Sequence, residues 1–464
     1  MPDFSTILQT PEVRAIVQEK ALERAFHDAL FAALLFRSEC NVMPWPAGVG
    51  DTYIATAPGL MPPSMKPLRP GVDPVPVTYA LEQWIAQLQT YASTSDVHMP
   101  TSIQAIVDLF MQNAHMLGLQ AAQSLNRKVR NRMYNAAESG HTVVDGVQNS
   151  ASMRVKRLNG FTRARSNSGS KVRFDPVSSS NPLAITIAES GVATTRNVIG
   201  FAPDIAGDEI GPGVLTLSAA ANCVDRDYLV ATDASEWGLV GGGNKVDDVG
   251  ITDRPRLQDV RDALAKFHQN NVPVHPDGHY HCHLDPTSNA LIFSDPEFQR
   301  LNTGLPDGLY YQQFVIGRLL GCLFFNNSEC PVTQTVYPND GVTYSDDDDF
   351  APELTNNGLA AGMPLHRMLF TAMGGITEYR QDQMQMISEA GIIGKTGEAQ
   401  VVNNGLEVNT DGVLLIFRAP LNRLQDKVST SWRFMGDWVC RTDAATGSRA
   451  RYKRFAETVH GQPV

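Results

Sequence analysis

Proline is unevenly distributed along this chain of 464 residues, and its distribution limits where helices can form. Nine of the 28 prolines lie between Pro44 and Pro76, whereas residues 101–137 contain none. Because proline fixes its backbone angle and lacks an N–H donor, the first stretch disfavours helix and the second permits it. This order predicts an extended arm followed by a long helix. Such an arrangement suits a subunit that grips its neighbours better than it suits a self-contained enzyme.

The proline-free stretch has the apolar spacing of one helix. Apolar residues recur every three to four positions and form a single stripe: Ile103, Ile106, Val107, Phe110, Ala114, Leu117, Ala121, Leu125 and Val129. A helix over residues 101–137 spans about 55 Å at about 1.5 Å per residue. Gly140 is its expected stop, because glycine favours the position after a helix end.

The segments before this helix are shorter. Thr10, Pro11 and Glu12 have the residue types of a helix start, and we expect that helix to run to about residue 36. Strands over 51–57 and 75–79, with prolines between them, describe a projecting loop. Residues 81–91 fit a strand or a short helix equally well.

Short β-rich runs separated by turn residues follow the long helix, and they predict a small sandwich or barrel inserted there: 171–177, 183–188, 197–202, 214–219 and 228–233. The pattern after residue 255 is mixed. It predicts helices over 256–268 and 384–393, a helix followed by a strand within 309–325, and strands over 279–284, 401–408, 413–418 and 431–440.

Composition excludes several classes of protein. The formal net charge is −11, so the chain as a whole is not a basic nucleic-acid wrapper. The six cysteines contain no CxxC pair, which favours reduced thiols over a disulfide framework. The N-terminus lacks a signal-peptide pattern, and the longest apolar run, residues 29–36, is far shorter than a membrane span of about 20 residues. We expect a soluble protein made in a cytosol-like compartment, with no membrane partner.

One run of residues suggests a metal site. His279, His281 and His283 alternate along an expected strand, so their side chains share one face, and imidazole nitrogen is a common zinc ligand. The alternative is a strand face that happens to carry histidines, and we favour it because no carboxylate–histidine helix motif accompanies the run. The sequence therefore predicts no metal, with these three histidines as the only candidate ligands.

Other motifs fail on spacing. The run GIIGKT, residues 391–396, ends like a phosphate-binding loop, but Glu389 occupies the position where that loop needs glycine. The aspartates at 346–349 lack the alternation of a calcium loop, and no serine lies in a GxSxG frame. We expect no catalytic residues, no cofactor-binding residues and no cofactor.

Positive charge is concentrated between Arg127 and Arg173, where eleven Lys/Arg accompany two acids, Glu138 and Asp145. This asymmetry indicates a patch for phosphate or for an acidic neighbour. The alternative is a solvated helix end next to a basic face of the inserted module. The candidate DNA-facing residues are Arg127, Lys128, Arg130 and Arg132.

Several longer runs resemble a known family. The run PRLQDVRDALAKFHQNNVPVHPDGHYHCHLDP, followed by NALIFSDPEFQRL, is similar to major capsid proteins of tailed bacteriophages, specifically the N4-like family of the HK97-type fold. The later runs LLIFRAPLNRLQDKVSTSWRF and GSRARYKRF, and GPGVLTLSAAA in the expected insert, are similar to the same family. These are packing patterns and are less specific than catalytic motifs.

The resemblance implies an α+β chain with the HK97-type capsid fold and an inserted all-β domain. Its parts would be an N-terminal arm (1–45), an extended loop (46–99), a peripheral domain with the spine helix (100–152), a β-rich insertion domain (153–240), an axial domain (255–400) and return strands of the peripheral domain (401–464). No scaffolding segment and no Lys–Asn crosslink are recognisable in the sequence.

The function implied is that of a non-enzymatic major capsid protein. It would self-assemble into hexamers and pentamers of an icosahedral phage head and enclose double-stranded DNA without sequence preference. Further implied partners are a scaffolding protein, a portal and, as an option, a decoration protein; the location is the virion, after synthesis in the host cytoplasm. The alternatives are a metal-dependent enzyme that uses His279, His281 and His283, and another structural part of the virion.

Overall fold

The computed structural model describes most of the chain between residues 35 and 461. The described residues are 35–46, 48–58, 64–65, 67, 71, 73–74, 76, 81–98, 106–168, 171–189, 191–206, 209–232, 234–245, 248–250, 252–303, 316–333, 364–381, 399–402, 405–410, 412–418, 427–440 and 453–461. The predictions for the N-terminal helix, residues 346–349, the helix over 384–393 and the GIIGKT run lie outside these residues.

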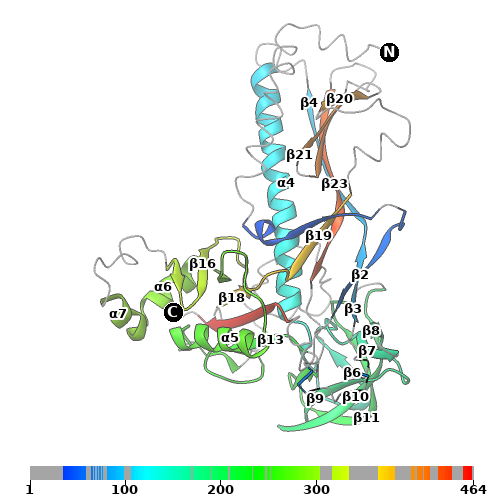
Figure 1. Cartoon of the computed structure of the whole chain (residues 1–464), viewed down its shortest axis with the longest axis vertical. Helices are drawn as coiled ribbons and strands as arrows, with labels where there is room; N and C mark the ends of the chain where they lie inside the picture. Colours follow the sequence, from blue (N-terminus) through cyan, green and yellow to red (C-terminus); the bar gives the residue numbers. More distant parts are fainter. Residues whose placement is uncertain are drawn as a thin grey trace. The chain divides into compact units, whose positions relative to one another are not determined.

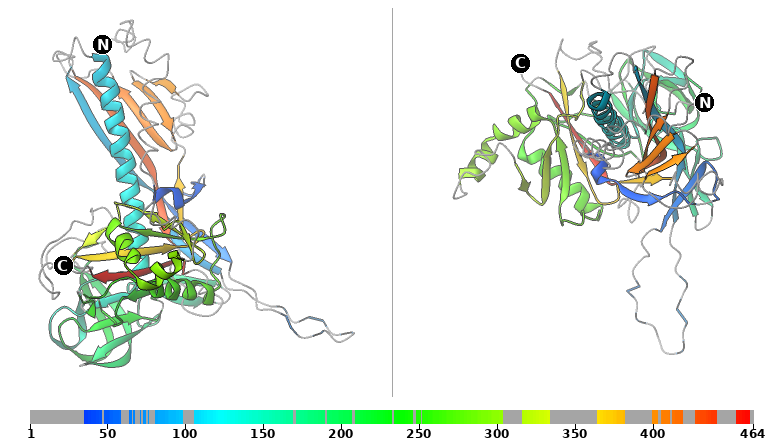
Figure 2. Two further views of the ribbon diagram at one scale, coloured as in Figure 1. Left: turned by 90° about the vertical axis from the view of Figure 1, so that its left-hand side faces the viewer. Right: turned by 90° about the horizontal axis from the view of Figure 1, so that it is seen from above.

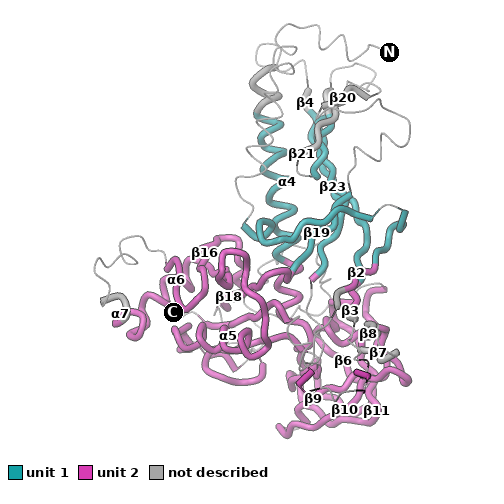
Figure 3. The backbone as a smooth tube through the Cα atoms, viewed as in Figure 1, with its two compact units in different colours: residues 1–53, 85–130, 376–439 teal, residues 54–84, 131–375, 440–464 magenta. Residues whose placement is uncertain are grey.

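The chain divides into two compact units, coloured separately in Figure 3. Unit 1 comprises residues 1–53, 85–130 and 376–439, and unit 2 comprises residues 54–84, 131–375 and 440–464. Each unit is assembled from segments far apart in sequence. Both units combine helix and strand, which confirms the mixed α and β content expected from the sequence.

Unit 1 is built on a seven-stranded sheet in the order β1-β19-β23-β22-β21-β20, with β4 also paired to β23. Its strands are β1 (Asn41–Pro44), β4 (Gln89–His98), β19 (Ile376–Arg380), β20 (Ala399–Val402), β21 (Gly405–Thr410), β22 (Val413–Arg418) and β23 (Lys427–Cys440), and the 3₁₀ helix η1 (Arg37–Glu39) precedes β1. The single strand expected over 401–408 is wrong. The structure has two strands there, β20 and β21, which pair antiparallel.

The long helix is α4 (Ile106–Ala137), 32 residues, which confirms the helix prediction over the described part of its range. Figures 1 and 2 show α4 running alongside β4 and β23, and Trp432 of β23 donates through Nε1 to Gln120 Oε1 at 3.5 Å. The predicted stripe is buried at Ala114, Leu117, Ala121, Leu125 and Val129. The stripe therefore packs inside the chain.

Gly140 follows α4, as predicted, with a positive φ of 82°. A Cβ atom placed there would lie 2.7 Å from the Ala234 Cα. Both the left-handed backbone and the close approach require glycine at this position. The chain turns here directly from α4 into the first strand of a small barrel.

That barrel, in unit 2, has the strand order β5-β12-β9-β10-β11-β6 with antiparallel pairing throughout. Its strands are β5 (His141–Val143), β6 (Gln148–Val155), β9 (Leu183–Glu189), β10 (Val192–Pro203), β11 (Gly213–Cys223) and β12 (Tyr228–Ala231). A bridge between Val144 and Val155 joins the two ends of the sheet and closes it. Inward-pointing residues such as Met153, Ile185 and Leu215 fill the interior.

Four of the five β-rich runs predicted from the sequence lie in this barrel. The remaining run, residues 171–177, is also a strand, β8 (Lys171–Pro176), but it belongs to a separate four-stranded sheet in the order β2-β3-β8-β7. The partners are β2 (Thr52–Pro58), β3 (Leu81–Gln87) and β7 (Arg163–Ser168). The strand over 51–57 is confirmed, and residues 81–91 form strands β3 and the start of β4 instead of a helix.

A second seven-stranded sheet in unit 2 has the order β13-β24-β18-β14-β16-β15, with β17 paired to β18. Its strands are β13 (Glu236–Leu239), β14 (Tyr280–Leu284), β15 (Arg318–Leu319), β16 (Cys322–Asn326), β17 (Val332–Thr333), β18 (Leu365–Thr371) and β24 (Phe455–Gly461). The strand over 279–284 is confirmed. The resemblance groups residues 455–461 with the return strands, but β24 pairs with β18 and β13 of this sheet.

Three helices accompany this sheet: α5 (Leu257–Gln269), α6 (Pro286–Phe293) and α7 (Pro296–Thr303). The helix over 256–268 is confirmed as α5, whose buried Val260, Leu264 and Phe267 pack on the sheet. Sequence reasoning missed α6 and α7. Their signal is an aspartate followed by proline, because Asp285 and Asp295 each accept hydrogen bonds from the first turn of the helix that follows.

Two chemical expectations bear on this fold. None of the helices in the described part of the chain is long and apolar enough to cross a membrane. All six cysteines lie in described residues, and no two of them form a disulfide.

Candidate functional sites

The three candidate metal ligands lie on or next to β14. His283 is buried and its ring stacks on Phe325 with 5.3 Å between ring centroids. His281 lies with Nε2 2.9 Å from Asp277 Oδ2. Among the described residues, neither His279 nor His283 belongs to a group of three ligand side chains whose donor atoms lie within 4.8 Å of one another.

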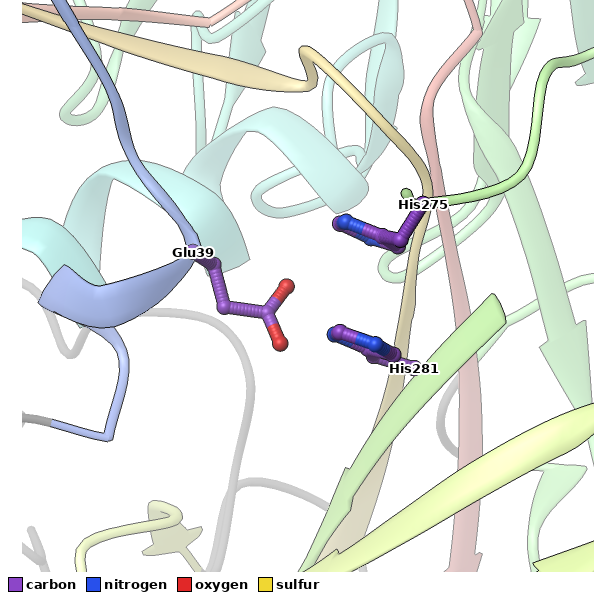
Figure 4. A group of neighbouring side chains, drawn as sticks. All are labelled: Glu39, His275 and His281. Atoms are coloured by element: carbon purple, nitrogen blue, oxygen red, sulfur yellow. The ribbon is translucent and has the colours of Figure 1, made fainter. Parts of the chain in front are cut away.

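His281 instead pairs with His275, which lies ahead of the strand. Their rings are parallel to within 2° and their centroids are 3.9 Å apart. Figure 4 shows the two rings face to face. The lone pair of an imidazole nitrogen lies in the plane of its ring, so one ion cannot lie in the planes of two stacked rings. This arrangement does not present a formed two-histidine metal site. Glu39, also labelled in Figure 4, belongs to unit 1, and we assign it no ligand role.

The four candidate DNA-facing residues occupy the second half of α4, and they differ in exposure. Lys128 and Arg130 are each only 6% exposed, whereas Arg127 and Arg132 are half-buried. The Lys128 ammonium lies 5.7 Å from the centroid of the Tyr91 ring, within the range of a cation–π contact. A buried cation does not reach a phosphate outside the protein, so the two buried residues are poor candidates in this conformation.

Basic residues further along the stretch pair with acids. Arg154 contacts Asp145 and Asp204, Lys156 contacts Asp145, and Arg163 contacts Glu209. Asp204 and Glu209 lie outside the stretch in sequence. The local excess of positive charge is therefore reduced by folding, which supports the structural interpretation of these residues over a free basic patch.

One group of charged residues in the described part of unit 2 is buried. Glu138, just after α4, accepts hydrogen bonds from Arg157, which follows β6, and from Arg367 on β18. Arg367 also donates to Glu457 on β24, and its guanidinium lies over the Tyr134 ring at 4.6 Å. We call Glu138, Arg157, Arg367 and Glu457 the arginine–glutamate cluster. Each of its four residues is at most 2% exposed.

The arginine–glutamate cluster joins three parts of unit 2: the end of α4, the barrel and the second sheet. Its two positive and two negative charges balance, which buried ions require because an unpaired charge is expensive to desolvate. Burial nevertheless raises the pKa of Glu457, and Arg367 opposes that shift. Sequence reasoning missed the cluster because its members are separated by up to 319 positions, from Glu138 to Glu457.

A second buried group also lies in unit 2. Asp285 accepts from His366 Nδ1 at 2.9 Å and from the Ser288 hydroxyl, and Ser288 Oγ lies 2.8 Å from His460 Nε2. We call Asp285, Ser288, His366 and His460 the histidine cluster. All four are buried, so this serine, histidine and aspartate set has no exposed nucleophile and does not have the access of a hydrolase triad.

The electrostatics of the histidine cluster follow from these contacts. Burial alone would raise the pKa of Asp285, but hydrogen bonds and charge from His366, with a contribution from Ser288, outweigh it and lower that pKa to about 2. Burial lowers the pKa of His460 to about 4, and the nearby His366 adds to this shift. At neutral pH, Asp285 is therefore ionised and His460 is neutral.

The segment between β2 and β3 is exposed, in contrast to the two buried clusters. Seven of its residues are described: Ser64, Met65, Pro67, Gly71, Asp73, Pro74 and Pro76. All seven are exposed, and Met65 is 85% exposed. At the base of this segment Gln83 donates to Thr56 at 3.2 Å, and the Leu88 N–H donates to the Asp51 carbonyl at 2.7 Å. The base is thus tied down while the described part beyond it contacts solvent.

Comparison with known proteins gives similarities in structure only. No protein-family model matches the sequence, and no curated protein matches it. The capsid of cyanophage P-SCSP1u is similar with a TM-score of 0.46 and 10% identity over 93% of this chain and 89% of that one. The capsid of Ralstonia phage GP4 has a TM-score of 0.46 and 10% identity over 92% and 91%. The holo-SrpI encapsulin complex of Synechococcus elongatus has a TM-score of 0.36 and 11% identity over 91% and 85%.

Proposed function

We propose that this chain is a major capsid protein of a tailed bacteriophage, with the HK97-type fold of the N4-like family. In this role it self-assembles into hexamers and pentamers of an icosahedral head that encloses double-stranded DNA, and it is not an enzyme. The sequence runs that resemble that family motivate the proposal. The observation that carries it is the exposed segment between β2 and β3, in which every described residue faces solvent.

The physical argument concerns what this segment can gain. Met65 is apolar, and an isolated chain gains nothing from leaving its side chain in water. Pro67, Pro74 and Pro76 reduce the freedom of the undocked segment, so less conformational entropy is lost when it binds. A stiffened, exposed segment with an anchored base is suited to contact another copy of the chain.

The proposed role brings further partners with it. A scaffolding protein and a portal are needed to build and fill such a head, a decoration protein is optional, and the final location is the virion. Contact with DNA would be non-specific, because phosphate contacts carry no sequence information. The half-buried Arg127 and Arg132 are the members of the basic set best placed for it.

The test is to replace residues 62–76 with a short Gly-Ser linker and to follow particle formation by negative-stain microscopy at rising protein concentration. We expect closed shells from the wild type, none from the variant, and an unchanged thermal unfolding midpoint for the unassembled variant. A matched control replaces the exposed Ser179 and Ser180 of a turn in unit 2 with glycine, and it should assemble normally.

Two outcomes would contradict the proposal. Compact monomers at every concentration would exclude self-assembly, and tubes or fibres in place of shells would assign the chain to another part of the virion. Stoichiometric zinc in the purified protein, lost on replacing His279, His281 and His283 with alanine, would instead support the enzyme alternative.

A further inference from the structure

The histidine cluster contains a series of three polar contacts. Asp285 Oδ1 contacts Ser288 Oγ, Ser288 Oγ contacts His460 Nε2 at 2.8 Å, and His460 Nδ1 contacts the Gly461 carbonyl oxygen at 2.9 Å. The ionised carboxylate and the carbonyl at the two ends can only accept. Each contact is a hydrogen bond only if one hydrogen lies within it, so the series needs three hydrogens.

The neutral cluster supplies two. Ser288 has one hydroxyl hydrogen, and a neutral imidazole has one N–H. With the hydrogen on Nδ1, Ser288 must choose between Asp285 and His460; with it on Nε2, the Nδ1 lone pair faces the Gly461 oxygen. Either tautomer leaves one pair of lone pairs in contact among buried residues.

One added proton removes this conflict. Protonated His460 donates from Nδ1 to Gly461 and from Nε2 to Ser288, and Ser288 donates to Asp285. The new positive charge is also linked to the negative charge of Asp285 through a single hydroxyl. No bond other than that to the proton is formed or broken.

We propose that the histidine cluster is a proton-binding site of the folded protein, in which His460 takes up one proton and strand β24 stays paired with β18 in the charged form. His366 and His460 lie directly opposite each other in the register of these two strands, with ring centroids 5.3 Å apart. The site therefore fastens the C-terminal strand of the second sheet to the start of α6. It does not depend on the proposed capsid role.

The surroundings contain one opposing and one supporting charge. His366 on β18 lowers the pKa of His460, and Asp285 ahead of α6 raises it. On β24 itself Glu457 is paired with Arg367 of β18, and on β13 Glu236 is paired with Lys266 and Lys453. Helix α6 and strand β17 carry no charged residue. Burial disfavours the charged imidazole, so uptake is expected below pH 6.5, toward the pKa of about 4 given above.

The test uses the unassembled full-length chain between pH 3 and 8. Exchange of the imidazole Cε1 hydrogen of His460, followed by mass spectrometry, reports proton uptake, and amide exchange of residues 455–461 reports the pairing of β24. We expect His460 to titrate as a separate step while the β24 amides stay protected across that step. Loss of β24 protection together with proton uptake would overturn the proposal, because burial would then expel the charged ring.

Variants separate the role of Ser288 from a general effect of substitution. Ser288→Ala should weaken proton binding at His460 by roughly tenfold, a pKa shift of about one unit, and should expose the β24 amides in acid. Ser294→Ala, at the exposed far end of α6, is the matched control. An unchanged titration in Ser288→Ala would refute the hydrogen count. His460→Gln should remove the step and keep β24 protected, and loss of β24 pairing in this variant at neutral pH would also count against it.

Discussion

The exposed segment between β2 and β3 and the arginine–glutamate cluster both depart from an average protein surface, but they find their partners in different places. The cluster holds four charged side chains, each at most 2% exposed, and pairs them within one unit. The segment leaves every described residue in solvent. Unit 2 thus pairs the charges of the cluster internally. Its segment between β2 and β3, stiffened by prolines, is available to contact another molecule.

The largest expected effect tests the arginine–glutamate cluster. Arg367→Leu removes the cation that bonds to both Glu138 and Glu457, so buried negative charge remains uncompensated. Breaking a buried pair in this way costs about 3–5 kcal/mol of the free energy of unfolding. Urea unfolding of the unassembled protein measures it.

The control for this prediction is Arg163→Gln. Arg163 pairs with Glu209, and their side chains are 36% and 43% exposed, so the loss should be about 0–1 kcal/mol. Equal losses of unfolding free energy in the two variants would mean that the buried cluster stabilises the protein no more than an exposed ion pair does.

The second prediction concerns acid and a single half-buried imidazole. His141, at the start of β5, donates from Nε2 to the Ser235 carbonyl at 3.0 Å and lies against the Trp237 ring. Burial, reinforced by Lys453 and Lys266, lowers the pKa of His141 from 6.5 to about 4. Because the unfolded chain binds this proton more readily, stability is fully present above pH 6.5 and is lost as the pH falls to 4, by roughly 3 kcal/mol.

His141→Gln keeps an amide donor for Ser235 and does not titrate, so it should flatten the fall in stability between pH 6.5 and 4. Urea midpoints are measured at pH 7 and pH 4 for the wild type and the variant, and the change between the two pH values is compared. His460 is present in both proteins, so its contribution cancels in this comparison. An equally steep fall in the variant would show that His141 does not carry the effect.

The third prediction tests the exposed segment between β2 and β3. Pro67→Ala, Pro74→Ala and Pro76→Ala each restore freedom to the undocked segment, at about 0.4–1 kcal/mol per residue. The protein concentration needed for assembly should rise by roughly two- to fivefold per substitution, whereas the unfolding midpoint of the unassembled chain should not move. Light scattering over a concentration series measures the first, and thermal unfolding the second. A lower unfolding midpoint without a change in assembly would mean that the prolines stabilise the unassembled chain and do not act in assembly.

The sequence predicted the features that depend on neighbouring residues. The helix ending before Gly140, helix α5 and the barrel strands follow from apolar spacing and turn residues, which are local signals. The division of residues 401–408 into two strands was missed because both halves have β-forming residues, although Asn404 followed by Gly405 is a local turn signal. The aspartate–proline starts of α6 and α7 were local signals that went unused.

The candidate sites were harder to predict because their chemistry depends on residues far apart in sequence. The alternation of His279, His281 and His283 indicated a shared strand face, but His281 stacks on His275 and His283 on Phe325. Likewise, the excess of basic residues between 127 and 173 gave no sign of Asp204 and Glu209, which pair with two of them. Local sequence reports the charges that a segment contributes, and the fold determines which of them are neutralised.

The smallest expected effect compares half-buried and buried basic residues within one helix, α4. In α4, Arg127 and Arg132 are half-buried, whereas Lys128 and Arg130 are each 6% exposed. If the helix end contacts packaged DNA, each phosphate contact contributes about 0.9 to the slope of log affinity against log salt. Arg127→Gln with Arg132→Gln should therefore reduce that slope by up to about 2 and lower DNA retention, with shells still forming.

Lys128→Gln with Arg130→Gln is the matched pair in the same helix. Because these side chains are buried and Lys128 lies over the Tyr91 ring, their loss should lower the unfolding midpoint and leave the salt slope unchanged. DNA binding measured between 50 and 200 mM salt, together with thermal unfolding, distinguishes the two pairs. A reduced slope in the buried pair alone would mean that this part of α4 opens on assembly. No change in slope in either pair would remove α4 from the DNA-contacting surface.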